Sequence, residues 1–298
     1  MEPGSHPTLG FIGIGTVGTA LVEAFAQNGY RIVALFDRKP ASSEALAKRL
    51  SSDVLDADSP QQVADQADVT FLTVSDDAIV SVADSVQWSA RNGVVHCNGA
   101  ASIDLLQRAQ RQGAMVGALH PLQSFANVAQ ARKNIPGSAF AIEASTAEFE
   151  QVLHDMVDAL GGTPLSLHGS KVLYHASAVM ASNYLVTLLE LASGLWEHLG
   201  ISQAEGLKAL LPLVRGTVEN LEAIGLPAAL TGPIARGDVG TVKRHVIALG
   251  EVAPELLSLY KQLARHTLPI ALAKGTIDSE VVERLDAALK EPRGGNES

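Results

Sequence analysis

The stretch that most constrains the fold lies at residues 9–36, where an apolar run, a glycine turn, a helix pattern and a second apolar run follow one another. The turn reads Gly-x-Gly-x-x-Gly, with its glycines at Gly13, Gly15 and Gly18. Strand, glycine turn, helix and strand in this order are typical of the βαβ unit that binds a dinucleotide. A glycine turn in some other α/β protein is the alternative, which this context disfavours.

Each position of the turn has an expected role. Gly13 permits the tight turn, Gly15 lets a pyrophosphate approach the backbone, and Gly18 lets the helix pack closely on the strand. The helix that follows offers free N–H groups and the positive end of its dipole to phosphate, at Thr16 and Val17 among others. The sequence therefore predicts cofactor contacts from Gly13 to Gly18.

The second apolar run, residues 32–36, ends in Asp37-Arg38-Lys39. An acid at this position holds the ribose 2′-hydroxyl of NAD, whereas a neighbouring arginine accommodates the 2′-phosphate of NADP. Arg38 can equally be a solvated surface charge. Asp37 and Arg38 are both predicted to contact the cofactor, and these residues alone leave the choice between NAD and NADP open.

Two later strand ends add cofactor candidates. Val74-Ser75-Asp76 should flank the phosphates and ribose, although Ser75 or Asp76 can also cap the helix expected at residues 76–88. Asn98 and Gly99 end the next run, where the nicotinamide ring is expected. His96 and Cys97, just before them, are expected to be buried structural residues.

Short Val/Ile/Leu-rich runs alternate with helix patterns through the first half of the chain, which favours a mostly parallel sheet covered on both faces. We expect strands at residues 9–14, 31–36, 69–74, 93–97, 114–119, 139–142 and 164–167. Further helices are expected at 42–50, 76–88, 102–112 and 147–160, with Ser42 and Ser102 as N-caps. The prediction is an α/β Rossmann-type domain over residues 1–168.

Strand patterns vanish after residue 169, so residues 169–298 are predicted to form an all-helical domain for substrate binding and dimerisation. Its helices are expected at 171–199, 203–224, 239–249, 253–268 and 278–289. The first of these is apolar on more than one face, which is typical of a helix central to a domain or buried between subunits. We therefore expect a homodimer.

Composition excludes several classes of function. A net charge of −10 argues against nucleic acid and anionic membranes as partners, and only 18% of the 298 residues are charged against 47% hydrophobic. The single cysteine, Cys97, cannot form an intramolecular disulfide, which fits the reducing cytoplasm. Residues 1–7 do not resemble a secretory signal, and no apolar stretch is expected to span a membrane.

Several polar residues near the expected cofactor site are candidates for catalysis or substrate binding. His120 ends a strand and is fixed by Pro121, a position suited to acid–base work, although a structural histidine is the alternative. His175, Ser182 and Asn183 interrupt an apolar helix, where unbonded polar groups are costly. Ser124 and Arg236 are candidate substrate ligands, and Arg236 can instead pair with an acid nearby. The nine histidines show no metal-ligand spacing, so no metal is expected.

Four motifs carry a resemblance that covers nearly the whole chain. They are His96-x-Asn98-Gly99-Ala100, His120-Pro121-Leu122-Gln123-Ser124-Phe125, Tyr174-His175 with Ser182-Asn183-Tyr184, and Thr231-Gly232-Pro233-Ile234-Ala235-Arg236-Gly237-Asp238. The chain resembles the 6-phosphogluconate dehydrogenase-like superfamily, which includes ketopantoate reductase and pyrroline-5-carboxylate reductase. Within it, the chain is most similar to a branch provisionally labelled NADP oxidoreductases, with a helical C-terminal domain of unknown function.

The resemblance implies an NAD(P)-dependent oxidoreductase, with NADP favoured, that passes hydride to a carbonyl or imine carbon of a small carboxylated substrate such as a ketopantoate-like acid. Relatives carry Lys-x-x-x-Asn on the first long helix, but Val179 stands where the lysine would precede Asn183. His175 or His120 is expected to donate the proton instead, with His175 preferred and Asn183 orienting the acceptor. The alternative function is a non-catalytic dinucleotide-binding sensor.

Overall fold

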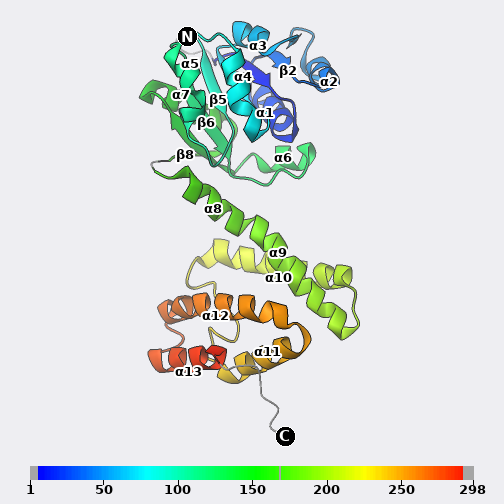
Figure 1. Ribbon diagram of the computed structural model, residues 1–298, viewed down its shortest axis with the longest axis vertical. Coiled ribbons are helices and arrows are strands. Elements are labelled where there is room, and N and C mark those ends of the chain that lie inside the picture. Colours follow the sequence, from blue (N-terminus) through cyan, green and yellow to red (C-terminus); the bar gives the residue numbers. More distant parts are fainter. Residues whose placement is uncertain (1–5, 168, 291–298) are drawn as a thin grey trace. The chain divides into compact units, whose positions relative to one another are not determined.

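The computed structural model describes residues 6–167 and 169–290, which divide into two compact units, one ending at Ser182 and the other beginning at Asn183 (Figure 1). The sequence places the boundary earlier, at 168/169. The difference is helix α8, Lys171–Ala181, whose first turns contact residues of the sheet. The first unit is an α/β domain and the second is helical, so the predicted fold class is confirmed.

One sheet of eight strands, in the order β3-β2-β1-β4-β5-β6-β7-β8, forms the centre of the first unit. All neighbouring strands pair in parallel except β6 and β7, which are antiparallel. The order reverses between β1 and β4, which is the switch point where α/β sheets bind ligands. The strands are β1 Leu9–Ile12, β2 Ile32–Phe36, β3 Leu55–Asp56, β4 Val69–Leu72, β5 Gly93–His96, β6 Met115–Pro121, β7 Ala139–Ala144 and β8 Thr163–Ser166.

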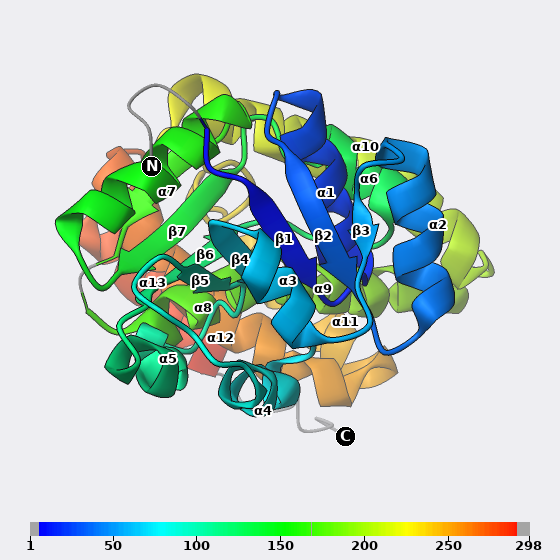
Figure 2. The ribbon, with the colours of Figure 1, turned by 90° about the horizontal axis from the view of Figure 1, so that it is seen from above.

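Helices cover both faces of the sheet (Figure 2). On one face Phe25 of α1 and Phe149 of α7 pack in a core with Phe11 and Phe71 of the strands. On the other face α3, α4 and α5 form a second core. Because the central strands are buried on both sides, their apolar runs are continuous. The helices are α1 Thr16–Gln27, α2 Pro40–Leu50, α3 Pro60–Gln66, α4 Ile79–Ser85, α5 Gln107–Arg111, α6 Val128–Asn134 and α7 Ala147–Ala159.

Several local expectations were wrong. Helix α2 begins at Pro40, so Ser42 lies inside it and Lys39 occupies the N-cap; proline at the first position replaces a capping side chain. Ser102 does cap a short 3₁₀ turn by accepting the N–H of Asp104. The helix expected to reach residue 88 ends at Ser85. Helices α3 and α6 went unpredicted because both are short and mainly polar.

The helical unit contains α9 Asn183–Gly194, α10 Gln203–Ile224, α11 Val239–Val252, α12 Pro254–Lys274 and α13 Ser279–Lys290. Its apolar core, which includes Val242, Leu268 and Leu285, belongs to α11, α12 and α13. Helix α10 starts with a capping box, in which Ser202 and Glu205 satisfy each other's backbone N–H groups.

The helix expected at residues 171–199 is interrupted. Helix α8 ends at Ala181, Ser182 is its C-cap, and α9 begins at Asn183 and passes into a 3₁₀ turn, Leu195–Leu199. Contrary to the expectation from sequence, Lys171–Leu199 is long and apolar enough to cross a membrane by length and composition alone. A helix that is apolar on most faces also occurs in the core of soluble proteins.

Candidate functional site

The glycine turn after β1 is closely packed at two of its three glycines. Gly13 has a φ of +99°, which a side chain would strain, and a methyl carbon on Gly18 would lie 2.3 Å from the Gly13 carbonyl oxygen. Thr73, at the end of β4, donates its hydroxyl to the same oxygen at 2.6 Å. Gly15 differs, because a methyl carbon there would have no neighbour within 4 Å. The structure therefore leaves space beside Gly15, where the pyrophosphate is expected.

Helix α1 begins directly at this space. Gly15 is its N-cap and supplies no side-chain hydrogen bond. The hydrogen bond from Thr19 N–H to the Gly15 carbonyl, at 2.9 Å, opens the helical ladder, so the N–H groups of Thr16, Val17 and Gly18 precede it. These N–H groups and the helix dipole fit a dinucleotide's phosphates.

Asp37 follows β2, and both of its carboxylate oxygens accept main-chain hydrogen bonds. Oδ2 accepts the N–H of Ile14, inside the glycine turn, at 2.6 Å, and Oδ1 accepts the N–H of Lys39 at 2.8 Å. The side chain therefore braces the turn against the end of β2. Arg38 and Lys39 are exposed beside it.

The residues after β4 form an exposed turn. Ser75 precedes a 3₁₀ turn, Asp76–Ala78, and makes no capping bond to it. A hydrogen bond from Ser75 is the largest of the effects that lower the pKa of the Asp77 carboxyl, and the nearby charge of Arg38 adds a small effect. Val74 is half-buried against the glycine turn, where its Cγ1 would lie 2.8 Å from a methyl carbon on Gly13.

The loop after β5 is shaped by its own side chains. His96 is fully buried; its Nδ1 accepts the N–H of Asn98 at 3.2 Å, so Nε2 carries the proton and donates to the Ser102 carbonyl at 3.1 Å. Burial, and then the charge of Lys171, lower the pKa of His96 to about 4. The Asn98 side-chain oxygen accepts the N–H groups of Ala100 and Ala101, both at 2.7 Å. Asn98 thus fixes the loop geometry at the strand end.

His120, in β6, contacts helix α8. Its Nδ1 lies 2.9 Å from the Tyr174 hydroxyl oxygen, the two rings are nearly perpendicular at 89°, and the His175 ring centroid is 6.3 Å from that of His120. Gly99 makes room, because a methyl carbon there would lie 2.7 Å from the His120 ring. Burial, then His175 and Lys171, lower the pKa of His120 to about 4. These effects favour the neutral form of the His120 imidazole at pH 7.

A buried ion pair lies beside these rings. Lys171 is the first residue of α8, its side chain is 5% exposed, and its Nζ is 3.5 Å from Oε2 of Glu143 in β7. Neither atom makes a hydrogen bond within the described part of the chain. Burial lowers the pKa of Lys171, and Glu143 opposes that shift. Burial also raises the pKa of the Cys97 thiol to about 12, which agrees with an unreactive structural cysteine.

The other predicted site residues are spread over both units. Ser124 is exposed in the loop after β6, where its N–H is bonded to Gln123, and Ser182 is exposed at the C-cap of α8. Asn183 and Arg236 belong to the helical unit and are both exposed. Arg236 adds the smallest of the effects that lower the pKa of Asp238, the N-cap of α11.

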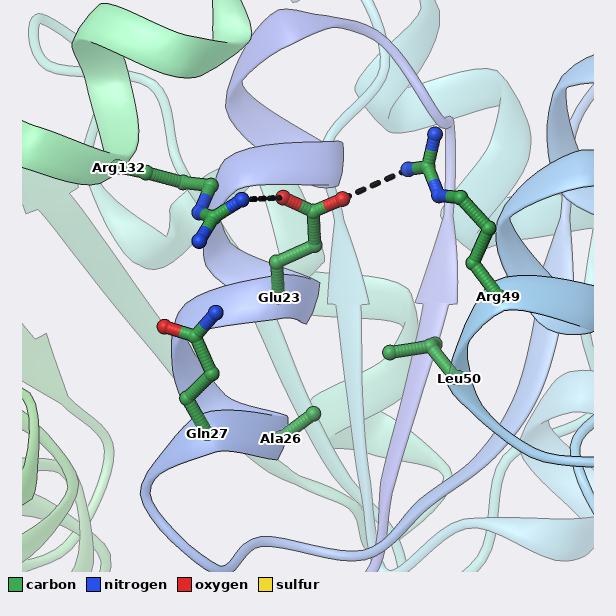
Figure 3. A pocket seen from close by; sticks show the side chains of 6 residues that line it. All are labelled: Glu23, Ala26, Gln27, Arg49, Leu50 and Arg132. Atoms are coloured by element: carbon green, nitrogen blue, oxygen red, sulfur yellow. Dashed lines mark hydrogen bonds and ion pairs between the residues drawn. The ribbon is translucent and has the colours of Figure 1, made fainter.

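A hollow of about 550 Å³ lies elsewhere on the first unit, among α1, α2 and α6 (Figure 3). Within it the Glu23 carboxylate pairs with Arg49 at 2.7 Å and with Arg132 at 3.3 Å. It contains none of the predicted site residues. In the described residues no group of His, Cys, Asp and Glu is arranged to hold a metal ion.

Two family models match the chain. A Rossmann-like domain matches residues 5–121, and a domain of unknown function (DUF2520) matches residues 138–267. The chain combines a Rossmann-like domain with a DUF2520 domain. This pair has the domain organisation of the superfamily branch that the sequence motifs indicated. The DUF2520 match begins at the start of β7, so this domain takes in β7, α7, β8 and α8 as well as helices of the second unit.

Solved structures share this fold across both domains. A provisionally assigned NADP oxidoreductase from Bacteroides fragilis has 22% identity and a TM-score of 0.68, covering 88% of this chain and 97% of its own. A 1-pyrroline-5-carboxylate reductase from Streptococcus pyogenes has 16% identity and a TM-score of 0.59, covering 96% and 99%. A reductive aminase from Aspergillus terreus, in complex with NADPH and ethyl levulinate, has 18% identity and a TM-score of 0.62, covering 95% and 99%. No curated protein sequence matches.

The DUF2520 part contains residues close to His120 that the sequence did not predict as site residues. The sequence motifs assign no role to Glu143 or Lys171, and Tyr174 occurs in them only beside His175. A charged residue that follows the apolar run 139–142 was the available signal for Glu143. The pairing of Tyr174 with His120 had no such signal, since the two residues are 54 positions apart.

Proposed function

We propose that this protein is an NADPH-dependent oxidoreductase that transfers hydride to a carbonyl or imine carbon of a small, carboxylated substrate. The observation that carries the proposal is the glycine turn, in which Gly13 and Gly18 are closely packed while Gly15 faces open space at the first turn of α1. The structural neighbours that reduce imines or bind NADPH support it. A ketopantoate-like acid is one substrate of this class.

The engagement of Asp37 favours NADP over NAD. Both of its oxygens already accept main-chain hydrogen bonds, so its carboxylate is turned toward the glycine turn. The exposed guanidinium of Arg38 is then the group suited to a 2′-phosphate, which it can bind through two parallel hydrogen bonds. Bound NADPH would supply the hydride. The chain's own residues would bind the substrate, orient it and protonate it.

Arg38→Ala is expected to raise the Kd for NADPH by about 10- to 100-fold, the equivalent of the ~1.5–3 kcal/mol typical of a hydrogen bond to a charged group. The Kd for NADH should change by less than about twofold, because NADH has no 2′-phosphate. Fluorescence titration of each nucleotide measures both values. Arg108→Ala, which removes an exposed arginine of α5, is the matched control. Equal losses for both nucleotides would contradict NADP selection by Arg38.

The proposed site residues follow from the glycine turn and the strand ends. Contacts to the cofactor are assigned to Gly13, Gly15, Thr16, Val17, Gly18, Asp37, Arg38, Val74, Ser75, Asp76, Asn98 and Gly99, with Asp37 acting through the turn that it braces. Ser124, Ser182 and Arg236 are assigned to the substrate, and His120, His175 and Asn183 to catalysis. His120 is neutral near pH 7, so it does not act as a cationic acid there.

Turnover tests this function directly. Purified protein is incubated with NADPH or NADH and a panel of 2-oxo acids and cyclic imino acids, and loss of absorbance at the reduced nicotinamide band is recorded. Reduction of at least one panel member supports the proposal. Tight nucleotide binding with no reduction of any member would favour a sensor, and absence of nucleotide binding would remove the dinucleotide interpretation altogether.

We also propose a cytoplasmic homodimer. The single cysteine is compatible with a reducing compartment. Large apolar side chains are exposed along α9 and α10, more than an isolated soluble surface normally carries. A second copy of this chain would cover them. They are Tyr184, Leu185, Val186, Leu188, Leu207, Leu211, Leu213, Val218, Leu221 and Ile224.

Leu213→Asp is expected to convert the dimer to a monomer, because it places a charge among these exposed apolar side chains. Sedimentation equilibrium at micromolar concentration measures the change as a halving of mass. Leu55→Asp, on an exposed leucine of β3 in the other unit, should leave the dimer intact. A wild-type protein that sediments as one chain would rule out the homodimer.

A further inference from the structure

We propose that Tyr174 donates the proton in this reaction, and that a neutral His120, carrying its own proton on Nδ1, holds the Tyr174 hydroxyl in place. The inference rests on the proposed reductase function and assigns a residue within it. The observation behind it is the 2.9 Å contact between His120 Nδ1 and the Tyr174 hydroxyl oxygen, at the meeting of β6 and α8.

The direction of this hydrogen bond decides the chemistry. If Nδ1–H donates to the tyrosine oxygen, the hydroxyl proton of Tyr174 is free for another acceptor. If the hydroxyl donates to Nδ1, Tyr174 has no proton to offer. No described residue forms a hydrogen bond with Nε2, and Gly99 lies against that edge of the ring. The proposal requires the proton on Nδ1, which leaves Nε2 as an acceptor.

Burial and two neighbouring side chains oppose the protonation of His120. Burial of the ring has the largest effect, followed by His175 and then by Lys171, whose Nζ lies beside Glu143. Cys97 adds no negative charge, because burial keeps its thiol protonated. His120 is therefore neutral at pH 7 and can donate from a single nitrogen. Lys171 and Glu143 act on the reaction through His120, as positioning residues.

The Tyr174 hydroxyl is expected to remain protonated until hydride transfer to the substrate begins. Burial raises the pKa of its hydroxyl to about 12, so the phenol is intact across the neutral range. Bound NADPH would supply hydride to the acceptor carbon, and the O–H bond of Tyr174 would break as its proton bonds to the alkoxide oxygen of a reduced carbonyl or the amine nitrogen of a reduced imine. The phenolate that remains accepts the Nδ1–H of His120, and water returns the proton. His175, one residue further along α8, is the competing donor.

The helical unit contains a matched pair for the experiment. His245 Nδ1 lies 2.9 Å from the Tyr260 hydroxyl, with rings at 80°, and neither residue belongs to the proposed site. Tyr174→Phe and Tyr260→Phe therefore remove the same hydroxyl from the same kind of contact in different surroundings. Any general effect of losing a Tyr–His hydrogen bond should occur in both variants.

The test begins without a substrate. Long-range ¹H–¹⁵N spectra of histidine-labelled full-length protein at pH 7, assigned with His120→Asn, report which ring nitrogen of His120 carries the proton. Nδ1–H is expected, and Tyr174→Phe should shift the His120 signals while Tyr260→Phe shifts only those of His245. Assignment of the proton to Nε2 overturns the proposal.

The second measurement uses NADPH and the best panel substrate. Tyr174→Phe should lower kcat by about 10²-fold or more, the contribution of a general acid, with the Kd for NADPH unchanged. Tyr260→Phe should stay within about threefold of the wild-type kcat, and the wild-type kcat should be level between pH 6 and 9. A histidine acid would instead lose activity above its usual pKa of about 6.5. Full activity in Tyr174→Phe, or that histidine profile, overturns the proton assignment alone. A wild-type protein that reduces nothing overturns the proposed function on which the assignment rests.

Discussion

Gly15→Asp is expected to abolish NADPH binding while the fold stays intact. The new carboxylate would occupy the open space beside Gly15 and accept the first N–H groups of α1, the groups proposed to hold the pyrophosphate. Repulsion between carboxylate and phosphate adds to this competition. The Kd for NADPH should rise by more than about 100-fold, equivalent to more than ~2.7 kcal/mol, as measured by fluorescence titration.

The same substitution should not destabilise the protein. Gly15 is the N-cap of α1, has a φ of −83°, and has no neighbour within 4 Å of an added methyl carbon. Aspartate is among the preferred N-cap residues, so the thermal midpoint should stay the same or rise. Gly18→Ala is the contrasting control, because its methyl group would meet the Gly13 carbonyl oxygen at 2.3 Å and lower the midpoint. Retained NADPH affinity in folded Gly15→Asp would exclude the glycine turn as the phosphate site.

The βαβ unit was predictable because each of its parts is local. Residues 9–12 form a strand buried on both faces, so they are apolar throughout, and the turn glycines are required by backbone geometry within six positions. The use of Asp37 was not predictable. Whether its carboxylate faces a ribose or the N–H of Ile14 depends on how β2 and the turn meet in space.

The positions of the polar residues at the strand ends were predictable from the sequence, but the side chains that they contact were not. The sequence predicts His120 at a strand end. Its pKa, however, depends on burial of the ring and on the nearby charges of His175 and Lys171, which lie more than 50 positions away in the sequence. Tyr174 and Glu143 become part of this cluster only through the packing of α8 against β6 and β7. Pairs so distant in sequence leave no periodic pattern that a single chain could reveal.

The break in the long apolar helix shows a further limit of pattern reading. Residues 171–199 are mainly apolar, and Ser182 and Asn183 place two small polar residues side by side within them. These residues favour helix ends because their side chains compete for backbone groups, yet each is also tolerated within helices. The structure places the end of α8 at this point, so Tyr174 and His175 belong with the sheet.

His120→Phe and Tyr174→Phe are expected to be strongly non-additive. Phenylalanine keeps a ring against Gly99 but removes the Nδ1–H that would stabilise the Tyr174 phenolate. Each single variant should lower kcat/KM by about 10²- to 10³-fold, and the double variant should lose little more, because residues that act as one unit cannot be lost twice. Steady-state kinetics on one panel substrate with saturating NADPH measures the cycle.

The corresponding cycle on His245 and Tyr260 should leave kcat/KM within about twofold of wild type in all three variants, since this pair has the same contact outside the proposed site. Independent losses that multiply to about 10⁴-fold or more in the His120 and Tyr174 double variant would mean that the two side chains serve separate steps. The 2.9 Å contact would then be structural, and His175 would be the remaining donor on α8. Strong coupling confined to His120 and Tyr174 would instead identify them as a single proton-delivering pair.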